Sequence, residues 1–274
     1  MKNALSVDLE DWFCADSLGY AVKKSEWDKY ELRALDSTKR LLAVLRRHNT
    51  RATFFVLGWI AEKLPQLIRE IEKGGHEIAT HGHHHLSLTR ITPAEFEEDL
   101  IRALEALKRT GIRQEISGYR APSFTLVEKT MWCLKILERY GFKYDSSIFP
   151  MGFYPMDKAP LSKLEPYKIT EKLYEVPLGC VDFVGWHIPF AGGVFFRFLP
   201  YGYTRYCIEK CNESKRAAVF YIHPWEIDPG QPKLKLPWYA YLRHYHNLDK
   251  TEGKLNDLLS EFEFTTIREV LELC

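Results

Sequence analysis

Apolar and polar residues follow one another along this chain in blocks that have the lengths of strands and helices. Short apolar runs, typical of strands buried on both faces, alternate with longer segments whose apolar residues recur at helical spacing. This alternation predicts a mostly parallel sheet with helical crossovers. The predicted strands are 4–7, 52–57, 76–80, 118–120, 143–145, 173–177, 217–222 and 263–265. The predicted helices are 32–47, 60–73, 93–110, 127–140, 255–262 and 267–273.

Residues 150–200 interrupt this alternation. The segment is rich in proline and aromatic residues and contains one predicted strand, 173–177. Long irregular segments in compact proteins tend to be functional, so we expect a loop-rich insertion over the mouth of a barrel. With 274 residues in all, the chain has the length of one barrel-like domain.

Chemically useful side chains gather at the carboxyl ends of the predicted strands. In parallel α/β folds, active sites are built at this end of the sheet. The residues concerned are Asp8, Glu10, Asp11, His81, His85, Arg120, Asp145 and His223.

The densest group is the sequence His-Gly-His-His-His at 81–85, directly after a buried strand. Neutral imidazole is the commonest zinc ligand, so the pattern favours a metal site at His81 and His85. We expect His83 and His84 to be structural or solvent-facing.

Two imidazoles need an anionic third ligand, and the acidic residues after the first strand supply candidates. Asp8 and Glu10 are two residues apart and project to the same side of a continuing strand. This favours Glu10 as the third ligand, with Asp11 as the alternative.

Each of the other residues has a structural explanation when taken alone. Arg120 could pair with a helix carboxylate, Asp145 could be a turn residue, and His223 could bond to a backbone carbonyl. Their shared position at one end of the sheet favours the functional interpretation.

Composition narrows the range of partners. Lys plus Arg (38) nearly balance Asp plus Glu (37), so charge does not point to nucleic acid or an anionic membrane. No stretch has the roughly 18 apolar residues that a membrane span needs. The first residues turn acidic too soon for a signal peptide, and we expect a cytoplasmic protein.

The six scattered cysteines predict structural thiols. The aromatic residues, 14% of the chain, suit either an ordinary core or a wall for stacking sugars.

Five of these features, in order, resemble the motifs of the polysaccharide deacetylases (carbohydrate esterase family 4, with a NodB-homology domain). The chain departs from the family at the first motif, where two adjacent aspartates are usual, and the third ligand therefore stays open between Glu10 and Asp11. The matching residues are Asp8-Leu9-Glu10-Asp11, His81 with His85, Arg120-Ala121-Pro122, Tyr144-Asp145-Ser146 and His223.

This resemblance implies a distorted (β/α)7-type barrel with parallel strands, forming a single polysaccharide deacetylase-like domain over residues 1–274. It also implies one divalent metal ion, for which Zn²⁺ suits the ligands best and Co²⁺, Ni²⁺ or Fe²⁺ would fit. Asp8 would be the general base and His223 the general acid. Arg120 would orient the base, and Asp145 would tune His223.

The implied activity is hydrolytic removal of N-acetyl groups from an amino sugar or polysaccharide precursor, in the synthesis of a surface polysaccharide. A metal-activated water, a carboxylate base and an imidazolium acid are the groups that amide hydrolysis needs. One alternative is an allantoinase-like or imidase-like hydrolase, although such relatives tend to lose parts of the metal motif. Another is an inactive sugar-binding barrel. We expect specificity to lie in 150–200 and 225–245.

Overall fold

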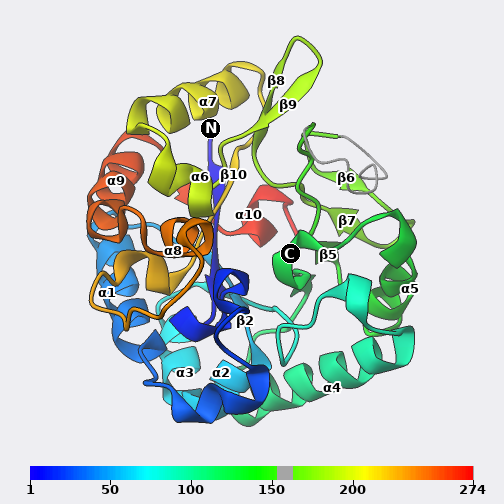
Figure 1. Ribbon diagram of the computed structural model, residues 1–274. Helices are drawn as coiled ribbons and strands as arrows, with labels where there is room; N and C mark the ends of the chain where they lie inside the picture. The colour runs from blue at the N-terminus through cyan, green and yellow to red at the C-terminus, as the bar shows by residue number, and fades with distance from the viewer. Residues whose placement is uncertain (153–162, 274) are drawn as a thin grey trace.

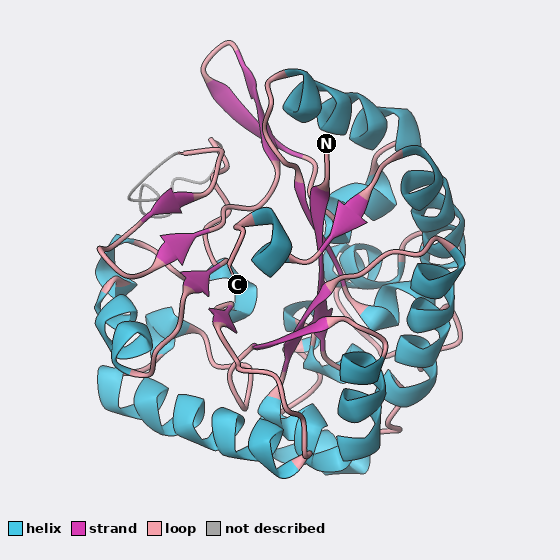
Figure 2. Cartoon of the chain, turned by 180° about the vertical axis from the view of Figure 1, so that it is seen from behind, coloured by secondary structure: helices cyan, strands magenta, loops and turns pink. Residues whose placement is uncertain are grey.

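The computed structural model describes residues 1–152 and 163–273 and has the predicted α/β architecture. The main sheet runs in the order β10-β1-β2-β3-β4-β5-β7-β6, and β11 also pairs with β1. Neighbours along this path are parallel except for β6 and β7. The sheet curls into an incomplete barrel with helices on its outside, in a single domain (Figures 1 and 2). The predicted distorted parallel barrel is confirmed.

The strands are β1 (Asn3–Leu9), β2 (Thr53–Val56), β3 (Glu77–Thr80), β4 (Gly118–Tyr119), β5 (Tyr144–Asp145), β6 (Tyr167–Lys168), β7 (Tyr174–Glu175), β8 (Cys180–Phe183), β9 (Trp186–Pro189), β10 (Val219–Ile222) and β11 (Phe264–Thr265). The helices are α1 (Ala34–Arg47), α2 (Gly58–Lys63), α3 (Pro65–Lys73), α4 (Pro93–Arg109), α5 (Trp132–Arg139), α6 (Gly193–Phe198), α7 (Tyr201–Glu213), α8 (Trp238–Tyr245), α9 (Leu248–Glu261) and α10 (Ile267–Val270).

Strand β1 is central to the sheet. All of its residues are buried, and it lies between β10 and β2, with Val7 opposite both Ile222 and Phe54. Since the strands on both sides run parallel to β1, their carboxyl ends meet at one edge of the sheet. This edge, which we call the mouth, receives the side chains that follow β1, β3, β4, β5 and β10.

Two predicted helices are divided in the structure. The segment 60–73 forms α2 and α3, separated by Leu64, whose φ of −129° and ψ of 53° are not helical. The cause is Pro65, because proline disfavours helical geometry in the residue before it. The segment 127–140 starts with a 3₁₀ turn, Glu128–Thr130, and α5 begins only at Trp132.

Helix α7 was not predicted from the sequence. Its buried positions, Thr204, Cys207, Ile208 and Cys211, have helical spacing but include few strongly apolar side chains. Helices α6 and α8 were also missed, and α9 begins at Leu248, ahead of the predicted start at residue 255.

The prediction for residues 150–200 requires correction. Strands β6 and β7 belong to the main sheet, where β7 pairs in parallel with β5. Strands β8 and β9 form a separate hairpin that begins beside the first residues of β10: Gly179 N–H donates to Val219 O at 2.9 Å, and Arg216 donates to Cys180 O. This hairpin therefore projects from the edge of the sheet opposite to the mouth (Figure 1). Residues 153–162 lie outside the described residues.

Two other expectations can be compared with the described residues. Cysteines 14, 133, 180, 207 and 211 are free and buried, as expected of structural thiols. None of the described helices has the length and apolar character needed to cross a membrane.

Replacing Gly118 by alanine is expected to destabilise the fold. A Cβ atom at this position would lie 2.1 Å from Cζ of Tyr144, a buried side chain whose hydroxyl donates to Glu77 Oε1 at 2.8 Å. Overpacking of this kind costs about 1–3 kcal/mol, which a urea unfolding curve measures. Gly202→Ala is the matched control, since no atom lies within 4 Å of its added Cβ and a helical alanine is favoured over glycine. Equal unfolding midpoints for the two variants would contradict the prediction.

Candidate active site and metal centre

Glu10, His81 and His85 come together at the mouth, in a cluster that we call the metal group. One ligand atom from each lies within 4.8 Å of the others, and all three side chains are buried. His85 has a left-handed backbone, with φ of 53°, and its Nε2 lies 3.3 Å from Glu10 Oε2. His81 Nδ1 bonds to the carbonyl oxygen of Arg120 at 2.8 Å. Because Nδ1 must donate to a carbonyl, Nε2 of His81 is the nitrogen left for a ligand.

These three residues fit a divalent cation. Glu10 Oε2 is buried and has no hydrogen-bond partner among the described residues, and burial raises the pKa of this carboxyl to about 8. Burial also lowers the pKa of His85 to about 3 and lowers the pKa of His81, so both imidazoles are neutral. A buried carboxyl, which a bound cation would deprotonate, beside two neutral imidazoles is a donor set that zinc prefers.

Asp11 does not share this position. Its carboxylate accepts backbone N–H groups from Trp12, Arg33 and Ala34 at 2.7, 2.8 and 2.7 Å. It thus caps the 3₁₀ turn Trp12–Cys14 and ties the start of α1 to the end of β1. The alternative in which Asp11 is the third ligand is therefore wrong for this geometry.

Asp8 and Arg120 form a buried ion pair beside the metal group. Arg120 Nη1 lies 2.6 Å from Asp8 Oδ1, and the side chains are 0% and 2% exposed for Arg120 and Asp8. Burial alone would raise the pKa of Asp8, but the charge and hydrogen bond of Arg120, with the charge of His223, outweigh it and hold the pKa below its usual value. Asp8 is therefore ionised, with one oxygen bound to Arg120.

His223 faces this pair from the end of β10. Its Nε2 lies 3.5 Å from Glu10 Oε1 and 3.9 Å from Asp8 Oδ2, while its Nδ1 lies 3.1 Å from Glu226 Oε2. Burial opposes protonation of the ring, but the bond and charge of Glu226, with the charges of Glu10 and Asp8, raise the pKa of His223 to about 9.

The role predicted for Asp145 does not fit the structure, because the carboxylate that meets His223 is Glu226. Asp145 accepts from the Ser147 hydroxyl at 2.6 Å, and Ser147 Oγ in turn accepts from Ala121 N–H at 2.7 Å. Asp145 also hydrogen-bonds to Glu175, whose pKa burial and the nearby Asp145 charge raise well above its usual value. Asp145 therefore supports the backbone next to Arg120 instead of touching His223.

His83 and His84 lie outside the metal group. His83 is buried against Gly58, where an added Cβ would lie 2.4 Å from the His83 ring. His84 is partly exposed and contacts Asp99, which also accepts the backbone N–H groups of both histidines. These contacts agree with the expectation that the two histidines are structural or solvent-facing.

Two residues of the site, Glu226 and Arg197, were not identified from the sequence. Glu226 carried one local signal, its position three residues after His223, where it also accepts His223 N–H at 3.0 Å as in a helix cap. Arg197, which binds Glu226 at 2.7 Å, comes from α6 and has no sequence signal that points to His223.

The aromatic residues divide between buried and exposed positions. Phe190, Phe196 and Trp225 are buried in the core. Trp238 and Tyr239 at the start of α8 are 78% and 49% exposed, and Tyr239 contacts Tyr20, which is 68% exposed.

Comparison with known proteins separates the chain into two parts. Residues 27–144 match the family described as Polysaccharide deacetylase, and residues 146–272 match the Domain of unknown function (DUF3473). The first part carries both metal-group histidines and Arg120. The second part carries Arg197, His223 and Glu226.

Curated relatives are similar over part of their length. A peptidoglycan-N-acetylglucosamine deacetylase from Bacillus cereus is 37% identical over 33% of this chain and 30% of its own. A chitooligosaccharide deacetylase from Bradyrhizobium is 39% identical over 26% of this chain and 32% of its own. The matched region thus spans about a third of these relatives.

Solved structures show the same fold. A protein described as a polysaccharide deacetylase from Mycobacterium smegmatis superposes with a TM-score of 0.61 at 21% identity, over 99% of this chain and 90% of that one. A family 4 pseudoenzyme from Bacillus anthracis has a TM-score of 0.51 at 12% identity, over 98% of this chain and 65% of that one. The motif residues and the fold agree with this match, and residues 27–144 of the chain belong to the polysaccharide deacetylase family.

Proposed function

We propose that this protein is a metal-dependent hydrolase that removes N-acetyl groups from an amino sugar or a polysaccharide precursor. The observation that carries the proposal is the convergence at one mouth of three groups with different chemical roles. They are the Glu10, His81 and His85 cluster, the Asp8–Arg120 pair and the His223–Glu226 pair. Metal-assisted amide hydrolysis uses a cation site, a base and an acid in such proximity.

In this proposal Asp8 is the general base. Arg120 Nη1 donates a hydrogen bond to Oδ1 of Asp8. Arg120 also donates to Ser6 Oγ and to the carbonyl and hydroxyl oxygens of Ser146. This fixes the carboxylate with Oδ2 turned toward His223 Nε2, 3.9 Å away. Oδ2 takes a proton from water as the water oxygen bonds to the acetyl carbon.

His223 is the general acid. When the C–N bond breaks, its electron pair goes to nitrogen, and that nitrogen takes the proton of His223 Nε2. The products are the free amine and acetic acid, which ionises to acetate; Asp8 releases its proton to solvent, and His223, left neutral, regains one from solvent. An amine leaves poorly without this proton, so the acid is needed for an amide.

A divalent ion held by Glu10, His81 and His85 would supply Lewis acidity, which lowers the pKa of water and polarises the acetyl oxygen. We propose zinc from the donor set, with Co²⁺, Ni²⁺ and Fe²⁺ as ions that suit the same ligands.

The substrate class is proposed from the relatives, whose names specify peptidoglycan, N-acetylglucosamine and chitooligosaccharides. We propose that this chain acts on a similar N-acetylated carbohydrate during synthesis of a surface polysaccharide, in the cytoplasm. The exposed rings of Trp238, Tyr239 and Tyr20 suit contact with sugar faces.

His81→Ala is expected to weaken zinc binding and to lower acetate release in parallel. The affinity should fall by more than the about 10–100-fold that follows loss of an outer hydrogen-bond partner, because a direct ligand is removed. Elemental analysis and competition with a zinc chelator measure binding, and acetate release from N-acetylglucosamine oligomers measures activity. His84→Gln is the matched control: this histidine belongs to the same run, binds Asp99 and should leave both readings close to those of the parent protein.

The same experiment separates the alternative functions. Zinc binding by His81→Ala equal to that of the parent protein would overturn the metal site. A zinc-loaded parent protein that releases no acetate from oligomers, nucleotide-linked or lipid-linked N-acetyl sugars would overturn the deacetylase proposal. Ring opening of allantoin or hydantoin would then favour the imidase-like activity, and sugar binding without turnover would favour an inactive barrel.

A further inference from the structure

A second charged network lies behind His223, on the side away from the metal group. Glu226 Oε2 lies 3.1 Å from His223 Nδ1 and accepts His223 N–H at 3.0 Å, so one carboxylate oxygen holds both the ring and the backbone of this residue. Since Nδ1 must carry a hydrogen to bond with a carboxylate, Glu226 fixes both the protonation of Nδ1 and the orientation of the His223 ring. Nε2 is consequently the nitrogen that faces Asp8 and Glu10.

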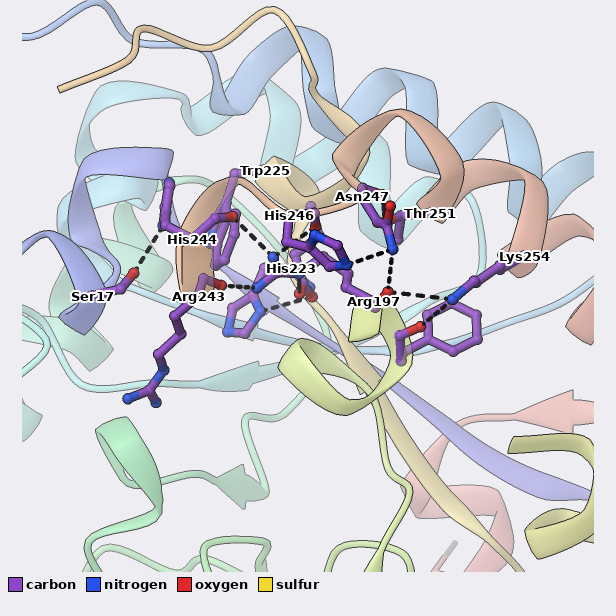
Figure 3. A network of polar contacts seen from close by, with 12 residues as sticks. Ser17, Arg197, His223, Trp225, Arg243, His244, His246, Asn247, Thr251 and Lys254 are labelled. Atoms are coloured by element: carbon purple, nitrogen blue, oxygen red, sulfur yellow. Dashed lines mark hydrogen bonds and ion pairs between the residues drawn. The ribbon is translucent and has the colours of Figure 1, made fainter. Parts of the chain in front are cut away.

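Glu226 is held in turn by Arg197. Arg197 Nε donates to Glu226 Oε1 at 2.7 Å, and each of these two side chains is 1% exposed. The remaining donors of Arg197 reach the backbone carbonyls of Arg243, His244 and His246 at 2.7 to 3.1 Å (Figure 3). The guanidinium therefore has partners on both sides, and the carboxylate between Arg197 and His223 has little freedom to turn.

The plane of the His223 ring is also fixed. It stacks on Trp225 with ring centres 5.0 Å apart and planes at 27°, and Trp225 stacks on His244 at 4.5 Å and 15°. His244 is anchored at both nitrogens, to Ser17 Oγ at 2.9 Å and Gln231 Oε1 at 2.8 Å. Hydrogen bonding and stacking thus restrain His223 in two independent directions.

We propose that Glu226 and Arg197 are positioning residues that direct His223 Nε2 at the nitrogen of the leaving amine. This inference rests on the proposed function, in which His223 gives its proton to that nitrogen. It transfers to Glu226 the role that the resemblance implied for Asp145, whose bonds go to Ser147 and Glu175. It also gives residues 146–272, which match a domain of unknown function, a part in the chemistry.

Two substrates with different leaving groups test this role. Departure of a sugar amine requires a proton, whereas 4-nitrophenolate leaves 4-nitrophenyl acetate as a stable anion. Misplacing the acid should therefore impair amide hydrolysis far more than hydrolysis of the aryl ester. A defect in folding or in the metal site would impair both substrates equally.

We expect Glu226→Gln in the zinc-loaded protein to lower kcat on N-acetylglucosamine oligomers by about 10²-fold, within the range of general acid catalysis, with little change in KM. The loss on 4-nitrophenyl acetate should be at least about tenfold smaller. In ¹⁵N NMR of histidine-labelled protein at a pH above the pKa of His223, where the ring is neutral, the His223 signals, assigned with a His223→Gln variant, should change from a fixed Nδ1–H form to a mixture of forms.

Glu226→Gln leaves Arg197 buried without its carboxylate, which can unfold the protein. The double variant Glu226→Gln/Arg197→Met removes both buried charges and should show the same amide-selective loss and the same NMR change. Glu209→Gln, which removes a surface carboxylate paired with Arg205, is the matched control and should behave as the parent protein does. Asp145→Asn should lower both activities to a similar extent and leave the His223 tautomer unchanged.

Three results would overturn the inference. Equal loss on both substrates in the Glu226 variants, an unchanged His223 spectrum, or an amide-selective loss in Asp145→Asn would each assign Glu226 a merely structural part. A parent protein that hydrolyses neither substrate would instead overturn the proposed function, and this role with it.

Discussion

Asp8→Asn is expected to lower the kcat for acetate release by about 10²–10⁴-fold, the contribution typical of a general base. Asparagine has the size of aspartate and still accepts a bond from Arg120, but it does not take a proton from water. The variant should bind zinc as the parent protein does, since the cluster of Glu10, His81 and His85 is intact. Initial rates per mole of folded, zinc-loaded protein measure the effect.

Asp11→Asn is the matched control for this prediction. Asp11 is also a buried carboxylate after β1, but its bonds go to the backbone N–H groups of Trp12, Arg33 and Ala34. We expect this variant to be less stable while its kcat stays close to that of the parent protein. The assignment of Asp8 as the base fails if Asp8→Asn retains more than about a tenth of the parent kcat.

Arg120→Met is expected to destabilise the protein by about 3–5 kcal/mol, because it leaves the buried charge of Asp8 without its partner. It also removes the donors that bind Ser6 Oγ and the Ser146 carbonyl and hydroxyl. A loss of this size is a large fraction of the stability of an ordinary domain. Urea unfolding measures it, with the m-value compared between proteins to verify that the unfolding transition is of the same kind.

Arg120→Lys tests whether charge alone is sufficient. Lysine keeps the positive charge but lacks the fork that reaches Asp8, Ser6 and Ser146 at once, so its stability should lie between those of the parent and Arg120→Met. As a surface comparison, Arg109→Met breaks an exposed pair with Glu105 and should cost at most about 1 kcal/mol. A change in Arg120→Met no larger than that in Arg109→Met would show that the buried pair does not stabilise the fold.

The sequence determined the architecture because periodicity and strand-end chemistry are local properties. Apolar runs placed β1, β2, β3 and β10, and a parallel sheet then requires that their carboxyl ends meet. This was sufficient to predict that residues such as Asp8, His81 and His223 share one edge. Where the local pattern was weak, as in α7 with its buried threonine and cysteines, prediction failed.

The orientation of side chains at that edge depended on the tertiary structure. Glu10 and Asp11 are adjacent in the chain, yet Asp11 turns away because the start of α1 offers it backbone N–H groups. Likewise, Asp145 ends β5 and Glu226 follows β10, but Glu226 meets His223 because it lies one helical turn further along the same backbone.

Arg197 shows most clearly what the sequence did not contain. It lies on α6, far from both His223 and the carbonyls of 243–246 in the chain, and the fold alone brings the three together. The sequence by itself therefore determined which edge of the barrel holds the chemistry and most of the residue types found there. The packing of distant segments decided which carboxylate faces each histidine, because a hydrogen bond requires the two atoms to lie within about 3 Å and sequence spacing sets such distances only within one strand or helical turn.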